Sequence, residues 1–253
     1  AHSDVMNELD DRLNDLFVRQ FNDLSENGLD VSAALSDEIG LEQLEALQKF
    51  VGSTVQLSGE EAFDTLGASI EFDMTSPAIE RYVEQYSMRL SRVLTDTTRR
   101  EMERIIGRGV EEGLTTENIA TGIREATHYS KPRSRMIART ETRMIYEEAR
   151  VEAWEQSELV KGKKWNLASG GCEFCKQITN IRPDAIPLKQ AFVPKGYTLI
   201  GTEGGSMKLD YKATMAPPLH PNCRCSMVSV LRDEPEEVSE RTWNDVEQEW
   251  KLG

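Results

Sequence analysis

The chain has 253 residues, of which 38% are hydrophobic and 7% aromatic, so it can bury a core in one large or two modest domains. It contains no apolar run of about eighteen residues and no basic segment followed by an apolar one at its N-terminus. These features argue against a membrane span and a signal peptide and lead us to expect an intracellular origin. The first residue is Ala1, which leaves a native, a processed and an excised terminus open.

The net charge of −14 is unevenly distributed. Residues 1–80 carry 3 basic and 18 acidic side chains, residues 81–230 carry 24 basic and 18 acidic ones, and residues 231–253 carry 3 and 8. Acidic ends therefore flank a mildly basic body. This distribution disfavours nonspecific nucleic-acid binding by the whole chain, but it leaves DNA contact through residues 81–230 open.

Two acidic amphipathic helices are predicted at the N-terminus. Apolar residues recur at helical spacing over residues 4–24, and Asn27-Gly28 ends that helix. A second helix is predicted from Ser36 to about Phe50, and the glycines of residues 52–75 indicate a connector with one short strand. We assign residues 1–70 to an acidic helical extension whose outer face is either simply solvated or attached to a basic partner.

Three further helices are predicted within residues 76–156. Ser76-Pro77 provides a cap and a first-turn proline for a long helix that reaches Gly113. Thr115 or Thr116 caps a short helix, and a third helix runs from about Ser130 to Gln156.

Three adjacent residues of the third helix, Arg139, Thr140 and Glu141, form a predicted structural polar network. Thr140 and Glu141 fall on the face expected to be buried, where an unpaired carboxylate is costly. We expect an arginine from elsewhere or backbone donors to pair with Glu141. The alternative is that Glu141 marks a functional pocket.

Strands and loops replace the helical period after Gly162. The pattern predicts strands over residues 164–167, 191–193, 207–212 and 225–230, with Pro- and Gly-rich loops between them. The expected fold class is therefore α+β, with a mainly helical N-terminal two thirds. A small, loop-rich antiparallel sheet over residues 163–230 follows, stapled by a Cys/His metal site.

The predicted metal site contains every cysteine of the chain. Its two segments are Cys172-Glu-Phe-Cys175 and His220-Pro-Asn-Cys223-Arg-Cys225. Two close-set pairs can complete a tetrahedral shell, which predicts structural zinc. Five donors compete for four positions. We favour the four sulfurs, with His220 as the substitute if Cys223 and Cys225 point to opposite faces of a strand.

Other roles for the cysteines remain open. A thioredoxin-like redox pair needs a strand before it and a helix that begins at the first cysteine, whereas the residues after Cys175 predict a turn and a loop. Two disulfides or four reduced thiols are the remaining alternatives.

Residues 231–253 form an acidic tail that ends in a predicted amphipathic helix. Trp243, Val246 and Trp250 fall on one stripe of that helix. Because two tryptophans are costly to leave in water, the stripe either packs back on the body or binds a partner protein.

The order of these motifs resembles the phage Mu F-like family of minor head proteins, also called head morphogenesis proteins. The resemblance covers about residues 70–230, which we assign to a Mu F-like body. Its motifs are Phe72-Asp-Met-Thr-Ser-Pro77, Glu112-Gly-Leu-Thr-Thr, Ile137-Ala-Arg-Thr-Glu141, Trp165, Cys172-x-x-Cys175 and Pro217-Pro-Leu-His-Pro-Asn-Cys-Arg-Cys225.

The resemblance implies a low-copy component of a tailed-phage or prophage head. Such a protein is made in the bacterial host cytoplasm and resides inside the head of the virion. There it contacts the portal, scaffold or major capsid protein during assembly and DNA packaging, without enzymatic activity. The alternatives are a nucleic-acid-binding zinc module and an enzyme acting on NAD or nucleic acid through Glu141 and Arg139. Scattered histidines and a closed four-ligand metal site argue against the enzyme.

Overall fold

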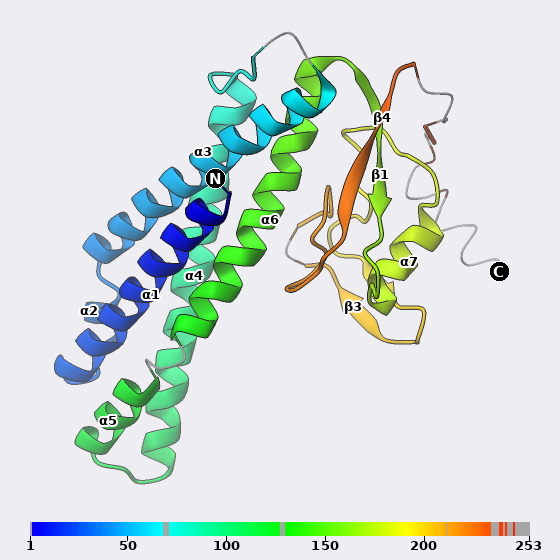
Figure 1. The fold of residues 1–253 in the computed structure, drawn as a ribbon. Helices are drawn as coiled ribbons and strands as arrows, with labels where there is room; N and C mark the ends of the chain where they lie inside the picture. Colours follow the sequence, from blue (N-terminus) through cyan, green and yellow to red (C-terminus); the bar gives the residue numbers. More distant parts are fainter. Residues whose placement is uncertain are drawn as a thin grey trace. The chain divides into compact units, whose positions relative to one another are not determined.

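A computed structural model describes residues 2–67, 71–126, 130–210, 212–233, 238–239, 241 and 245. Contacts within the chain separate two compact units, described one at a time below (Figure 1). The helical unit comprises Ala1–Val55 and Met74–Thr142, and the mixed unit comprises Gln56–Asp73 and Arg143–Gly253. None of the described helices combines the length and apolar character needed to cross a bilayer.

The helical unit is built from helices alone within the described residues. They are α1 (His2–Glu26), α2 (Val31–Ala34), the first part of α3 (Asp37–Leu66), α4 (Pro77–Glu111), α5 (Thr116–Ala126) and the first part of α6 (Ser130–Ser157). Buried apolar side chains of α1, α2, α4 and α5 form one cluster: Phe21, Leu24, Ala34, Met102, Ile119 and Ile123. Burial of these faces, more than intrinsic propensity, stabilises the helices.

Buried polar contacts tie the helices of this unit together. The Gln43 amide of α3 donates to the Ser91 hydroxyl of α4 at 2.9 Å. The Ser134 hydroxyl of α6 donates to the buried Asp10 carboxylate of α1 at 2.5 Å. Because these buried polar groups have partners, the bundle avoids the cost of leaving them unsatisfied.

The predicted helix starts are confirmed at two places. The Ser76 hydroxyl accepts from the Ala78 N–H at 3.3 Å, with Pro77 in the first turn of α4. The Thr115 hydroxyl accepts from the Asn118 N–H at 3.3 Å before α5. Both side chains satisfy N–H groups that have no partner within their helix.

The predicted connector over residues 52–75 is wrong in its first half, because α3 continues to Leu66. Val51, Val55 and Phe63 are buried and continue the apolar stripe past Phe50. Gly59 lies inside the helix, where an added Cβ would stand 2.2 Å from the Phe72 ring. This glycine allows close packing and does not break the helix. The short helix α2 was also not predicted.

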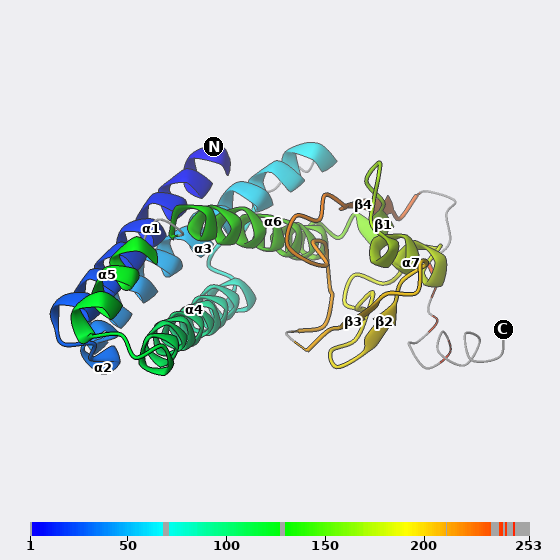
Figure 2. The ribbon, with the colours of Figure 1, turned by 90° about the horizontal axis from the view of Figure 1, so that it is seen from below.

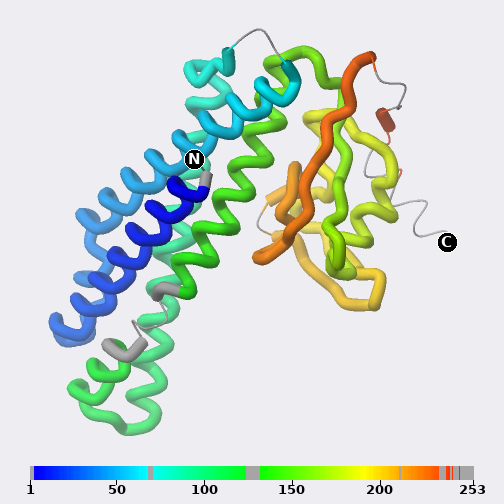
Figure 3. The backbone as a smooth tube through the Cα atoms, in the orientation of Figure 1, coloured from blue at the N-terminus to red at the C-terminus, as the bar shows by residue number. Residues whose placement is uncertain are grey.

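The mixed unit joins the ends of α3 and α6 to five elements. These are β1 (Val160–Asn166), α7 (Glu173–Ile181), β2 (Thr198–Ile200), β3 (Ser206–Lys208) and β4 (Ser226–Leu231). Strands β1 and β4 run antiparallel with Trp165 opposite Met227, and β2 pairs antiparallel with β3 (Figure 3). Helix α7 packs against β1 and β2 (Figure 2). A mainly helical chain with small antiparallel strand pairs near its end confirms the predicted α+β class.

Several details of the mixed unit differ from the prediction, among them β2, which lies in a stretch expected to be loop. Residues 173–181 form α7 instead of a turn and a loop, because Cys175, Ile178 and Ile181 make a buried helical stripe. Residues 191–193 form no regular strand, and Val193 makes only an isolated bridge to Thr214. The predicted helix with Trp243, Val246 and Trp250 lies outside the described residues.

A lysine side chain is fully buried in the mixed unit. Lys163 in β1 is 0% exposed, and its ammonium donates to the Met215 carbonyl at 2.8 Å. Burial lowers the pKa of Lys163 to about 7, although Glu148 and Glu155 act in the opposite direction. The unfolded chain, with an ordinary lysine pKa, therefore binds more protons than the folded chain between about pH 7 and pH 10.

Lys163 should make the free energy of unfolding rise with pH across this window. Lys163→Met removes the titrating group, so between pH 7.5 and 9.5 the native chain should gain about 2 kcal/mol relative to the variant. Urea unfolding of both proteins at several pH values measures this difference, and titrations common to both cancel. Parallel stability curves would contradict the prediction.

Candidate metal centre

The two cysteine segments meet in the mixed unit. Helix α7 begins directly after Cys172, which occupies its N-cap position, and Cys175 lies in its first turn. His220, Cys223 and Cys225 lie in the segment before β4. The β1–β4 pair and the cluster around Trp165 and Phe192 hold these two segments in place.

Five donor atoms form two overlapping groups that share Cys175. The groups are Cys172, Cys175 and His220, and Cys175, Cys223 and Cys225, and within each the ligand atoms lie within 4.8 Å of one another. The Cys175 and Cys223 sulfurs are 3.6 Å apart, and the His220 Nε2 lies 3.1 Å from the Cys172 sulfur and 3.6 Å from the Cys175 sulfur. Each of the two groups is therefore compact enough to bind a metal ion.

These three distances lie close to the edge lengths of a tetrahedral thiolate and imidazole shell. Ordinary zinc bond lengths imply edges of about 3.8 Å between two sulfurs and about 3.5 Å between sulfur and nitrogen. A disulfide would need about 2.05 Å, and all four cysteines are free. The sulfurs of Cys223 and Cys225 both reach the group around Cys175, so the two residues do not diverge as an alternating strand would require.

The imidazole of His220 is oriented as a ligand. Its Nδ1 lies 2.8 Å from the Pro221 carbonyl oxygen. Because a carbonyl only accepts, Nδ1 carries the proton of the neutral ring, and the lone pair of Nε2 faces the sulfurs. A second-shell hydrogen bond of this type fixes the tautomer of a metal-binding histidine.

The surroundings of Cys225 favour its thiolate form. Hydrogen bonds from the Cys175 and Cys223 thiols hold the pKa of Cys225 well below its ordinary value, and the Ala168 N–H and the Trp165 side chain act in the same direction. The indole N–H of the buried Trp165 has the Cys225 sulfur as its acceptor. An electron-rich thiolate, free or metal-bound, suits this donor.

The turn and loop predicted after Cys175, which argued against a redox pair, are absent from the described structure of this segment. A strand precedes Cys172 and a helix does begin there, as a thioredoxin-like motif requires. The metal interpretation instead follows from the three further donors, His220, Cys223 and Cys225, which an isolated redox pair lacks.

The residues of the predicted polar network lie on α6 in the helical unit. Glu141 is 9% exposed and accepts a 2.6 Å hydrogen bond from the Tyr86 hydroxyl of α4. Arg139, two residues before Glu141, is exposed, and Thr140 is half-buried. A phenol is therefore one partner of Glu141, and its pairing with an arginine or a backbone group stays a prediction.

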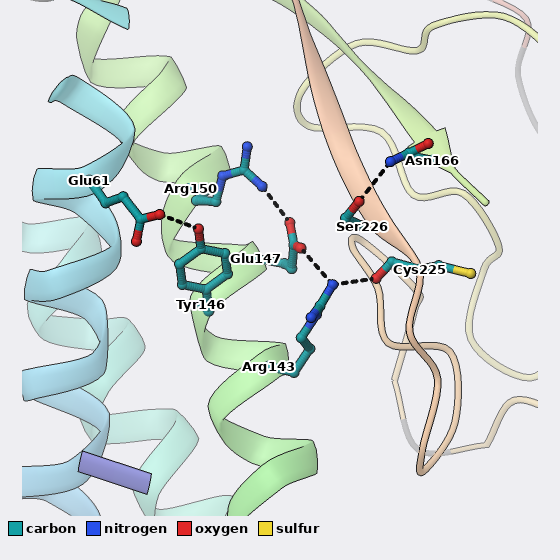
Figure 4. Close-up of polar contacts among 8 residues, drawn as sticks. All are labelled: Glu61, Arg143, Tyr146, Glu147, Arg150, Asn166, Cys225 and Ser226. Carbon is teal, nitrogen blue, oxygen red and sulfur yellow. Dashed lines mark hydrogen bonds and ion pairs between the residues drawn. The ribbon is translucent and has the colours of Figure 1, made fainter. Parts of the chain in front are cut away.

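A polar network that the sequence did not reveal lies on α6 in the mixed unit. Arg143, Glu147 and Arg150 form ion pairs, and Arg143 also donates to the Cys225 carbonyl (Figure 4). The spacing of an acid four residues after one arginine and three before another was the available signal. It was missed because the expected buried stripe did not include Glu147.

Comparison with known proteins decides the family. A family model described as "Phage Mu protein F like protein" matches residues 100–228, half of the chain, including both cysteine segments. The chain belongs to the phage Mu protein F-like family. The resemblance inferred from the motifs is thereby confirmed.

A curated relative extends this Mu F-like match. "Uncharacterized protein YqbB" of Bacillus subtilis (strain 168) is 23% identical over 134 residues, which are 53% of this chain and 44% of the relative. The chain thus spans less than half the length of that relative. No solved structure matches the chain.

The metal centre should be detectable in protein purified without added metal. Elemental analysis should find about one equivalent of a divalent ion, and Cys175→Ser should remove most of it because Cys175 belongs to both donor groups. Arg224→Ser changes an exposed neighbour and should bind as the native chain does. Affinity should fall with decreasing pH because thiols must lose protons to bind. Less than about half an equivalent, together with absent free thiols, would instead indicate disulfides.

The Tyr86–Glu141 bond should contribute measurably to stability. Tyr86→Phe should lower the free energy of unfolding by about 1.5–3 kcal/mol, because it removes a buried hydrogen bond to a carboxylate. Glu141→Gln and the double variant complete a cycle, and urea unfolding should give a coupling of about 1 kcal/mol or more. Additive effects of the two substitutions would show that the bond contributes nothing specific.

Proposed function

We propose that the protein is a minor head protein of a tailed phage or prophage, which acts as a structural interaction protein during head assembly and DNA packaging. The family match carries this proposal. It spans residues 100–228 and so includes the cysteine cluster and the strands around it. The part shared with the family therefore includes both segments that a metal ion at the cluster would link.

The proposed partners are the portal, the scaffold or the major capsid protein, and the proposed location is the interior of the virion head. The acidic extension over residues 1–70 lies outside the matched range, as does the tail over residues 231–253. Flanks of this kind are suited to partner-specific contacts, whereas the matched range supplies the common scaffold. DNA contact through residues 81–230 stays a prediction.

The proposed metal is zinc with a structural role. Thiolate and imidazole donors in a tetrahedral arrangement suit zinc better than magnesium or calcium, which prefer oxygen donors. Four protein ligands close the coordination shell and leave no position for water or substrate. When bound, the ion would link the start of α7 to the segment before β4 and would supply no chemistry to a substrate.

The enzymatic alternative has weaker support. It requires Glu141 and Arg139 to act together in a pocket. Glu141 is buried against the Tyr86 hydroxyl, whereas the Arg139 side chain is exposed to solvent. This difference favours a structural role for Glu141 within the helical unit.

Association with head proteins tests the proposed function. The tagged full chain, expressed in turn with the portal, scaffold and major capsid protein of its phage, should retain one of them on purification. Cys175→Ser should lose this retention because the mixed unit loses its staple, whereas Arg224→Ser should keep it. Failure to retain any of the three, together with normal DNA-filled heads from a deletion phage, would overturn the proposal.

A further inference from the structure

A partly buried charged cluster on α6 faces the chain at the start of β4 (Figure 4). The Arg143 guanidinium donates to the Cys225 carbonyl oxygen at 3.0 Å and lies 3.8 Å from the Glu147 carboxylate. Arg150 donates to the other oxygen of Glu147 at 3.0 Å. Glu147 is 1% exposed, so its carboxylate depends on these partners.

The same cluster also reaches a backbone group within β4. The Met227 N–H donates to the Glu147 carboxylate. In a strand the N–H and C=O groups of alternate residues point to the same edge, so Cys225 and Met227 present theirs together. Strand β4 pairs only with β1 among the described strands. At the edge of β4 that does not pair with β1, Arg143 and Glu147 thus supply the donor and the acceptor that a further strand would supply.

The contacts fix the backbone on both sides of Ser226. A third contact holds Ser226 itself, because the Asn166 amide of β1 donates to its hydroxyl at 2.9 Å. Burial raises the pKa of Glu147, and Arg150 and Arg143 oppose this shift. The carboxylate therefore needs both arginines to stay charged in its buried position.

The position of this backbone matters because Cys225 is one of the candidate metal donors. Its sulfur lies within 4.8 Å of the Cys175 and Cys223 sulfurs, and its side chain is only one bond longer than that of alanine. A small displacement of the Cys225 backbone would therefore move the sulfur directly. Outer-shell groups that orient ligands typically change metal affinity by about 10–100-fold when they are removed.

We propose that Arg143 and Glu147 are positioning residues of the metal centre, which hold the Cys225 backbone so that its sulfur meets Cys175 and Cys223. This inference rests on the proposed metal centre. Arg150 supports it indirectly by keeping the Glu147 carboxylate paired. Arg150 pairs with Glu147, and Glu147 in turn pairs with Arg143. Glu147 and Arg143 then hold the backbone of residues 225–227.

The test compares zinc affinity among full-length variants by competition with a chelator. Arg143→Met and Glu147→Gln should each weaken zinc binding by about 10–100-fold while one ion is still bound. The double variant should be about as weak as the weaker single variant, because the two residues act as one unit. Arg139→Met is the matched control, since Arg139 is an exposed arginine one turn earlier on α6, and it should bind as the native chain does.

A second measurement separates positioning from general stabilisation. A purely structural role would lower the stability of the metal-free and metal-loaded proteins equally. Positioning should shrink the increase in thermal midpoint that zinc produces, and Arg143→Lys should lie between the native chain and Arg143→Met. Cobalt substitution should also show a weakened sulfur-to-metal charge-transfer band in Arg143→Met and Glu147→Gln.

The possible outcomes distinguish the two proposals. If the native chain binds no zinc or cobalt, both the proposed metal centre and the positioning role are overturned. If the native chain binds metal and the two variants match Arg139→Met in affinity, only the positioning role is overturned. The positioning role would also be overturned if the variants were less stable but zinc raised their thermal midpoint as much as it raises that of the native chain.

Discussion

The mixed unit depends on the contact between two segments that are far apart in the sequence, the start of α7 and the chain before β4. Between Ile181 and Ser226 the described chain forms only β2 and β3, each three residues long. Strands this short are marginal by themselves. Buried residues such as Ile178, Phe192 and Leu199 contribute a core, and scattered backbone hydrogen bonds join the loops around them. A metal ion at the cysteine cluster would restrict these loops, and structural zinc sites in small domains contribute about 10–16 kcal/mol.

The second constraint is the buried carboxylate of Glu147. A hydrophobic residue would fill the same space without any desolvation cost, so this charge is a poor way to gain stability alone. The Glu147 carboxylate is useful because its hydrogen bonds and ion pairs are directional. A carboxylate and a guanidinium can satisfy the Met227 N–H of β4 and the Cys225 C=O just before it at once, which apolar side chains cannot do. The charged cluster thereby covers a strand edge and selects one position for the strand on α6.

Local signals in the sequence predicted helix starts well, because a cap depends on only a few neighbouring residues. Ser76 and Thr115 are examples, since each hydroxyl bonds an N–H two or three residues ahead. Gly59 was misinterpreted because its role depends on Phe72, which is distant in the chain and packs where a side chain would otherwise be. The helix after Cys172 was missed because its stripe of Cys175, Ile178 and Ile181 is short and contains a cysteine, which we had assigned only to metal binding.

The candidate metal site was predictable as a set of residues, whereas its geometry was not. Spacing in the sequence identified all five candidate donors and favoured the four sulfurs, with His220 as the substitute. Three-dimensional contacts refine it, since Cys175 belongs to both groups and Cys223 and Cys225 lie together beside it. The remaining position is contested by Cys172 and His220, whose ligand atoms approach each other at 3.1 Å. The hydrogen bond to Pro221 has already oriented the His220 ring, whereas the N-cap sulfur of Cys172 makes no capping bond that would oppose its movement toward a metal. Either choice closes the coordination shell with protein ligands, and a closed shell suits a structural element better than a catalytic one.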